Sequence, residues 1–223
     1  MIEANEIFSG PDERVALWFD NDDDTNGLAI MAENVISENI KLISVAPESV
    51  EFMWTCLEKT DTKIMTRYFF YPNKKTMDSQ IYDLVKDVTS IFKVGADGVQ
   101  IFVKISDLDQ IITNLGVVRD DLFFEHDLSV GMDICDLEIS DYDVLFQKLR
   151  DIRANSLVLT LKEDAGNRSD FVGRVYGLLQ NWDFDGQLHF VLNNDYDRMD
   201  QVIRLVESER PELSKKLRFF LNY

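Results

Sequence analysis

Eight short runs rich in Val, Ile, Leu and Phe recur along this chain of 223 residues, and a helical pattern separates each run from the next. Strict alternation of buried strands and helices favours parallel pairing, because a parallel neighbour needs a crossover connection. Eight strands at spacings of about twenty to thirty-five residues predict an α/β fold with a closed (β/α)8 barrel. An open doubly wound sheet is the alternative. The predicted strands are Val15–Asp20, Leu42–Ala46, Lys63–Tyr68, Val99–Lys104, Leu122–Asp127, Ser156–Lys162, Leu188–Asn193 and Leu217–Asn222.

No linker or domain boundary interrupts this alternation, so residues 1–223 are expected to form one barrel domain. The chain ends at Tyr223, directly after the predicted eighth strand, and an eighth helix is therefore missing. Phe219 and Leu221 would face outward there and need cover from the N-terminal segment or from a second subunit. A homo-oligomer through the uncovered eighth strand is one expectation. The predicted helices are Thr25–Asn39, Val50–Lys59, Met77–Lys93, Ser106–Leu115, Asp141–Ile152, Asp170–Asn181 and Asp197–Glu207.

The charge and the motif content exclude several classes of protein. A formal net charge of −18 argues against nucleic-acid partners and against docking on anionic membranes. No signal-peptide pattern and no apolar run long enough to span a membrane are present. Cys56 and Cys135 lack metal-type spacing, which indicates free thiols and a cytoplasmic location. No nucleotide-binding glycine motif occurs, and no cofactor is expected.

The alternation within each strand indicates which residues face the barrel axis. Val99, Ile101 and Val103 would face the helices, so Gln100 and Lys104 would face inward. Applied to every strand, this rule predicts a polar ring at the carboxyl end of the barrel, where active sites of this fold lie. The alternative is that a barrel mouth is polar because it meets water. The predicted ring consists of Asp20, Glu48, Arg67, Lys104, Glu125, Lys162, Asn193 and Asn222.

Two lysines on alternate strands indicate imine chemistry. A lysine attacks a carbonyl group when a nearby cation or desolvation lowers its pKa. We expect Lys162 to be the nucleophile, with Lys104 as a charged partner held by Glu125. Glu125 or Asp20 would transfer protons. The remaining ring members, Glu48, Arg67, Asn193 and Asn222, would bind a small carbonyl substrate. A lysine at a strand end is also a common salt-bridge partner.

Several segments resemble class I aldolase barrels. "LISVAPESVEFMWTCLEKTDTKIMT", "VGADGVQIFV" and "LVLTLKEDAG" are similar to deoxyribose-phosphate aldolases, a likeness that implies a Schiff base on Lys162. "LWFDND" and "VQIFVKIS" are similar to transaldolases, which implies roles for Asp20 and Lys104 instead. The resemblance implies a carbon–carbon lyase. Gln100 stands where the first family has an aspartate, and "LHFVLNN" lacks its assisting lysine.

Two other functions remain open from the sequence. A metal-dependent sugar isomerase or epimerase would use Asp20, Glu48, Glu125, His126 and Asp127 as ligands of a divalent ion. A non-catalytic barrel would act through protein contacts. The aldolase interpretation needs no metal.

Overall fold

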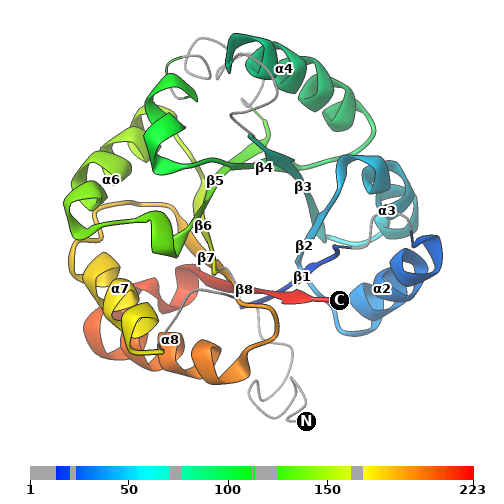
Figure 1. The fold of residues 1–223 in the computed structure, drawn as a ribbon. Helices are drawn as coiled ribbons and strands as arrows, with labels where there is room; N and C mark the ends of the chain where they lie inside the picture. The colour runs from blue at the N-terminus through cyan, green and yellow to red at the C-terminus, as the bar shows by residue number, and fades with distance from the viewer. Residues whose placement is uncertain (1–13, 21–23, 71–76, 112, 114–124, 162–167) are drawn as a thin grey trace.

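The computed structural model describes residues 14–20, 24–70, 77–111, 113, 125–161 and 168–223. These residues include a closed barrel of eight parallel strands, each paired with its neighbours in the sequence (Figure 1). Val15 to Trp18 pair with Phe219 to Asn222, which closes the sheet. The predicted barrel is therefore confirmed, and the open doubly wound sheet is wrong. The strands are β1 (Val15–Trp18), β2 (Leu42–Val45), β3 (Lys63–Phe69), β4 (Gly98–Phe102), β5 (Asp127–Asp133), β6 (Ser156–Thr160), β7 (Gln187–Val191) and β8 (Leu217–Asn222).

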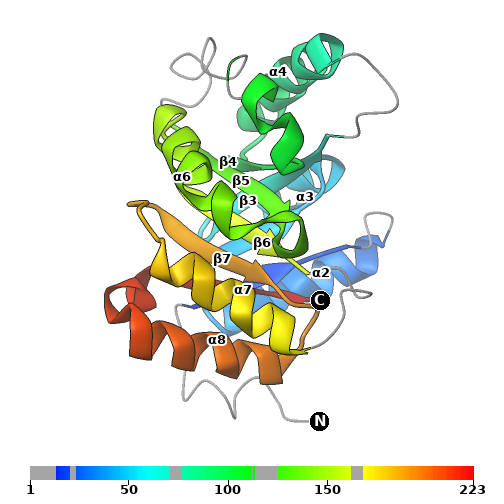
Figure 2. The same ribbon diagram turned by 60° about the vertical axis from the view of Figure 1, so that its left-hand side comes forward.

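The helices lie outside the barrel, in the connections between strands (Figures 1 and 2). Asp24 and Asp195 cap two of them, since their side chains accept hydrogen bonds from backbone N–H groups of the first turn. The predicted helix Ser106–Leu115 lies partly outside the described residues and is helical from 108 to 111. Among the described helices, none has the length and apolar character needed to cross a membrane. The helices are α2 (Thr25–Ser37), α3 (Val50–Leu57), α4 (Met77–Lys93), α6 (Tyr142–Asp151), α7 (Arg168–Gln180) and α8 (Tyr196–Glu209).

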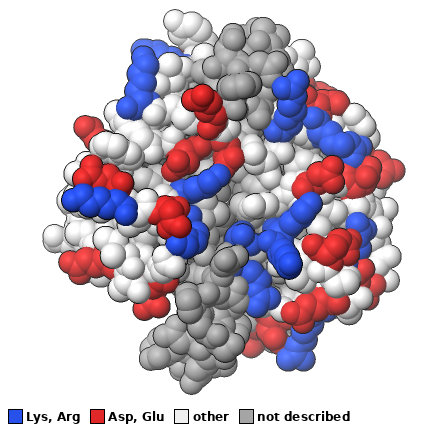
Figure 3. All heavy atoms as spheres, turned by 180° about the vertical axis from the view of Figure 1, so that it is seen from behind, with Lys and Arg blue, Asp and Glu red and all other residues white. Residues whose placement is uncertain are grey.

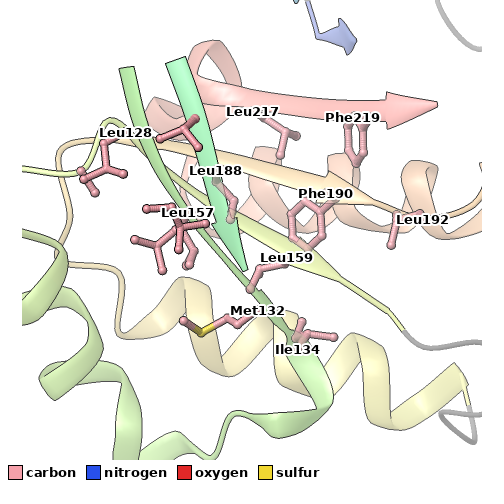
Figure 4. Packing of buried hydrophobic residues seen from close by; sticks show 14 of the residues in the cluster. Leu128, Met132, Ile134, Leu157, Leu159, Leu188, Phe190, Leu192, Leu217 and Phe219 are labelled. Carbon is pink, nitrogen blue, oxygen red and sulfur yellow. The ribbon is translucent and has the colours of Figure 1, made fainter. Parts of the chain in front are cut away.

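Side chains on the strands alternate between two separate apolar layers. The larger layer fills the space between strands and helices, and Figure 4 shows its part along β5 to β8. The smaller layer lies inside the barrel and consists of Ala16, Trp18, Phe102, Val158, Val191 and Phe220. Because side chains of a strand point alternately to its two faces, the sequence pattern predicts this division.

The outer face of β8 is covered within a single chain. Phe219 is 0% exposed and Leu221 is 6% exposed, and both belong to the outer apolar layer. The Phe219 ring stacks on Phe190 of β7 at a centroid distance of 6.0 Å. The prediction that both side chains need cover is confirmed. A second subunit is not required to supply it, and oligomerisation through β8 stays a prediction.

The fifth strand differs from its prediction. It spans Asp127–Asp133 and pairs with β4 and β6, whereas it was predicted at Leu122–Asp127, of which residues 122–124 lie outside the described residues. This register places Leu128, Val130 and Met132 in the outer apolar layer. Small residues, Ser129 and Gly131, then face the interior. The segment 122–127 reads LFFEHD and does not alternate, whereas LSVGMD alternates and provides small inward residues at this point of the barrel.

The Phe102 ring occupies the place where a Gly131 side chain would lie. A Cβ atom at Gly131 would lie 2.3 Å from two carbons of that ring. We expect Gly131→Ala to lower the free energy of unfolding by about 1–3 kcal/mol, because overpacking displaces a buried aromatic group. Gly173 of α7 is the matched control, since a Cβ there meets nothing within 4 Å. Gly173→Ala should stabilise by about 0.5–1 kcal/mol in urea unfolding. Equal effects of the two substitutions would contradict this packing.

A buried histidine lies on the inner side of β7. His189 is 4% exposed, and its Nε2 lies 2.9 Å from Oε1 of Gln187. Burial, and then the positive charge of Arg218, lower the pKa of the His189 imidazole to about 3. The ring is therefore neutral in the folded protein at neutral pH.

This low pKa makes folding stability depend on pH. Below pH 6.5 the unfolded chain binds a proton at His189 that the folded chain does not bind, so stability falls as the pH drops towards 3. We expect the wild type to lose about 1.4 kcal/mol more than His189→Asn between pH 7.5 and 5.5. This range stays above the sequence pI of about 4.4. Urea titrations of the two proteins that shift in parallel would contradict the assignment.

Candidate active site

A buried arginine connects β3 to β1 at the carboxyl end of the barrel. The Arg67 side chain is 4% exposed, and its Nη1 donates to Oδ1 of Asp20 at 3.2 Å. Its second terminal nitrogen donates to the Phe19 carbonyl oxygen. The guanidinium carbon lies 4.2 Å from the centroid of the Trp18 ring, a cation–π distance. Asp20 also accepts a hydrogen bond from the Trp18 indole. The predicted ring members Asp20 and Arg67 are therefore brought together.

Aromatic rings fill the barrel interior beside this ion pair. Trp18 meets Phe102 and Phe220 edge to face, at centroid distances of 5.7 and 5.8 Å. Phe69 stacks on Phe102 at 4.8 Å. Since rings in such contact leave little room for water, this layer separates the mouth from the rest of the interior. A substrate at the carboxyl end would rest on these rings.

Glu125 is not part of the mouth. It precedes the first residue of β5, so it lies at the amino end of the barrel. The prediction that Glu125 ends the fifth strand and holds Lys104 at the rim is therefore wrong. The cause is the misplaced strand, which put the amino end of β5 where its carboxyl end was expected.

Asp133 is the acid that β5 carries to its carboxyl end. It pairs in register with Thr160 of β6 and is 7% exposed. Its Oδ1 accepts a hydrogen bond of 2.8 Å from the Cys135 backbone N–H. Asp133 is not among the predicted site residues, because the fifth strand was predicted in the preceding run. The signal was present in "LSVGMD", which alternates between apolar and small or polar residues.

The structure describes only one of the two predicted lysines, Lys104. Lys104 directly precedes the short 3-10 helix Ile105–Asp107 after β4, and it is exposed. The pairing of β4 with β5 ends at Phe102 and Gly131, two residues before Lys104 and Asp133, so both residues belong to the carboxyl end of the barrel. Lys162 lies outside the described residues.

Two asparagines join the ends of β7 and β8. The Asn222 side-chain amide donates to Oδ1 of Asn193 at 3.0 Å. Asn194 closes the same corner, with its side chain bonded to the backbone N–H and carbonyl of Asn222. Asn193 and Asn194 have φ values of 48° and 59°, a left-handed conformation that asparagine tolerates. Glu48 lies exposed after β2, in the 3-10 helix Pro47–Ser49.

The predicted metal ligands are divided between the two ends of the barrel. Asp20 and Glu48 follow their strands, whereas Glu125 and His126 precede β5 and Asp127 begins it. The His126 ring stacks on Phe92, and Asp127 forms a 2.6 Å ion pair with Lys63. In the part of the chain that the structure describes, no three His, Cys, Asp or Glu side chains are grouped as metal ligands. The geometry contradicts this five-residue site.

Known proteins resemble this chain in structure but not in sequence. Neither a family model nor a curated protein matches the sequence. A deoxyribose phosphate aldolase from Aeropyrum pernix superposes with a TM-score of 0.68 at 9% identity, over 98% of this chain and 90% of that one. The shared fold is the closed (β/α)8 barrel. A candidate deoxyribose-phosphate aldolase from Coccidioides immitis gives 0.69 at 9% identity, over 95% and 80% of the two chains.

The same fold is shared with enzymes of other activities. The homocysteine methyltransferase MmuM from Escherichia coli has a TM-score of 0.63 at 10% identity, over 95% of this chain and 90% of that one. Since a barrel of this kind supports unrelated reactions, function has to be argued from the side chains at its ends.

The Asp20–Arg67 pair provides a test of the geometry at the mouth. Asp20→Asn removes the carboxylate that faces a buried cation, so we expect a loss of about 1–2 kcal/mol in the free energy of unfolding. Asp61→Asn is the matched control, because Asp61 pairs with Lys41, whose side chain is 39% exposed. Little change is expected there. Urea titrations in which both variants lose the same stability would contradict the assigned burial of Arg67.

Proposed function

We propose that this protein is an aldolase-like carbon–carbon lyase that forms a Schiff base between a lysine at the carboxyl end of the barrel and a small carbonyl compound. The observation that supports the proposal is that Lys104 follows β4 by two residues and that the buried Asp133 ends the neighbouring strand β5, so both belong to the carboxyl end of the barrel. Lys162, two residues after the last residue of β6, is the second candidate and the nucleophile that we favour.

The proposed reaction begins with attack of a neutral lysine amine on the carbonyl carbon. The resulting carbinolamine loses water to give an imine, and a carboxyl group supplies and removes the protons. Asp133 replaces Glu125 in this role, because it lies at the correct end of β5. When the carbon–carbon bond breaks, its electron pair moves onto the imine to give an enamine, and protonation and hydrolysis then release the product.

Arg67 and the aromatic layer would give this site its selectivity. The Trp18 ring contacts both partners of this ion pair, in which the Asp20 side chain is 62% exposed at the mouth and Arg67 is buried. The rings beside them exclude water from the underside of the substrate. A short, polar carbonyl compound fits this combination.

Borohydride trapping tests the proposal. The protein is incubated separately with acetaldehyde, glyceraldehyde and pyruvate, reduced with borohydride and examined by mass spectrometry. We expect one adduct per chain, with the mass of the carbonyl compound less one oxygen atom. Lys162→Met should abolish the adduct, whereas Lys104→Met should reduce it by about tenfold or more, since loss of a charged partner weakens activation.

Lys93→Met is the control, because Lys93 lies exposed in the last turn of α4. It should retain the full adduct. An adduct lost only in Lys104→Met would transfer the nucleophile to β4. The absence of an adduct with all three compounds would overturn the proposal in favour of a non-catalytic barrel.

A further inference from the structure

A large cavity opens at the amino end of the barrel, opposite to the proposed lyase site. Its volume is about 980 Å³, and its lining includes the first residues of β3, β5 and β7. Figure 3, seen from behind the view of Figure 1, shows Lys and Arg side chains gathered around the middle of this face. None of the eight residues of the predicted polar ring is among its lining residues, and Asp127 is the one predicted metal ligand that is.

The cavity has the opposite charge to the chain as a whole. Its lining includes three acids, Asp61, Asp127 and Asp185. It also holds six of the 23 lysines and arginines, so its formal charge is +3 in a chain of −18. A concave wall of one charge raises the local concentration of ions of the other sign. The six bases are Lys41, Lys63, Arg150, Arg153, Lys216 and Arg218.

The favourable interaction of a cation with the end of a helix explains the position of only some of these six basic residues. Arg150 lies in the last turn of α6, where a cation interacts favourably with the helix dipole. Lys63 and Arg218 are strand residues, and the alternation of β3 and β8 turns them towards the barrel axis. Lys63 forms its ion pair with Asp127 while its side chain is 55% exposed, so the pair contributes little and can exchange for a ligand.

The wall of the cavity reaches a buried imidazole ring with one nitrogen that has no hydrogen-bond partner in the described part of the chain. His189 lines the cavity, and its Nδ1 has no hydrogen-bond partner among the described residues. Next to it in the lining, the hydroxyl of Ser156 donates to that of Ser129 at 2.6 Å. A buried ring nitrogen without a partner is costly, and a polar group of a ligand would satisfy it.

We propose that this cavity binds a phosphorylated small molecule, with its phosphate against Lys63 and Arg218 and its polar body near His189. Three of the lining residues are arginines, and a guanidinium group can donate two parallel hydrogen bonds to phosphate oxygens. The volume far exceeds that of a phosphate ion and lies at the upper end of small-molecule pockets, at about 300–1,000 Å³. Such a site is separate from the lyase site.

Isothermal titration calorimetry with ribose 5-phosphate, pyrophosphate and citrate tests this proposal. We expect one ribose 5-phosphate bound per chain, and binding that weakens with added salt. Lys63→Gln and Arg218→Gln should each weaken it by about tenfold or more. Arg204→Gln is the control, because Arg204 pairs with Asp200 outside the cavity and its side chain is 77% exposed. It should bind as the wild type does.

The His189→Asn variant and the comparison with citrate distinguish a site for a phosphorylated molecule from a site for any anion. His189→Asn should weaken ribose 5-phosphate at least threefold more than pyrophosphate, since only the former has a polar body. Binding of citrate as tight as that of ribose 5-phosphate would overturn the phosphate assignment. An equal loss in Arg204→Gln, or no heat at about 10 mM ligand, would overturn the site itself.

Thermal unfolding of each variant identifies any loss of folding. Lys63→Gln should leave the borohydride adduct unchanged, so failure of either proposal is recognised separately.

Discussion

Backbone pairing between β1 and β8 is the constraint on which the other features depend. Once the sheet is closed, each strand has one side towards the axis and one towards the helices, and the register of its neighbours fixes which residue lies opposite which. Phe102 consequently faces Gly131 across β4 and β5. A slip of β5 by one residue would bring Leu128, Val130 and Met132 into an interior already filled by aromatic rings. The position of Asp133 at the mouth follows from the same register.

The interior divides the barrel into two ends with different chemistry. At the carboxyl end, the rings of Trp18, Phe102 and Phe220 lie against the buried Arg67, and acids and lysines follow the strands. Deeper in the barrel, hydroxyl, amide and imidazole groups replace the rings, and Ser44 donates to Gln100 at 2.6 Å. The cavity at the amino end is basic. Because the aromatic layer lies between them, the two ends can bind separate molecules without contact.

Much of this architecture follows from the sequence, and the exceptions have physical causes. Hydrophobic alternation is sufficient to predict the barrel, the bounds of β8 and α4, and the placement of Asp20 and Arg67 at one rim, but not their ion pair. The fifth strand was misplaced because the apolar run LFF at 122–124 was given more weight than the alternation of LSVGMD that follows it. The space for Gly131 is defined by Phe102, which lies almost thirty residues earlier in the chain. The basic cavity could not be predicted, since its charges lie between Lys41 and Arg218 and gather only when the barrel closes.

The central claim is that the chemistry of this barrel takes place on a lysine at its carboxyl end, beside Asp133. A crystal structure of the protein reduced with borohydride in the presence of pyruvate tests it most directly. The account predicts continuous electron density between the Nζ atom of Lys162 or Lys104 and the pyruvate carbon skeleton, above the Trp18 and Phe102 rings. Unmodified lysines at this end, or pyruvate attached to a lysine at the amino end, would contradict it.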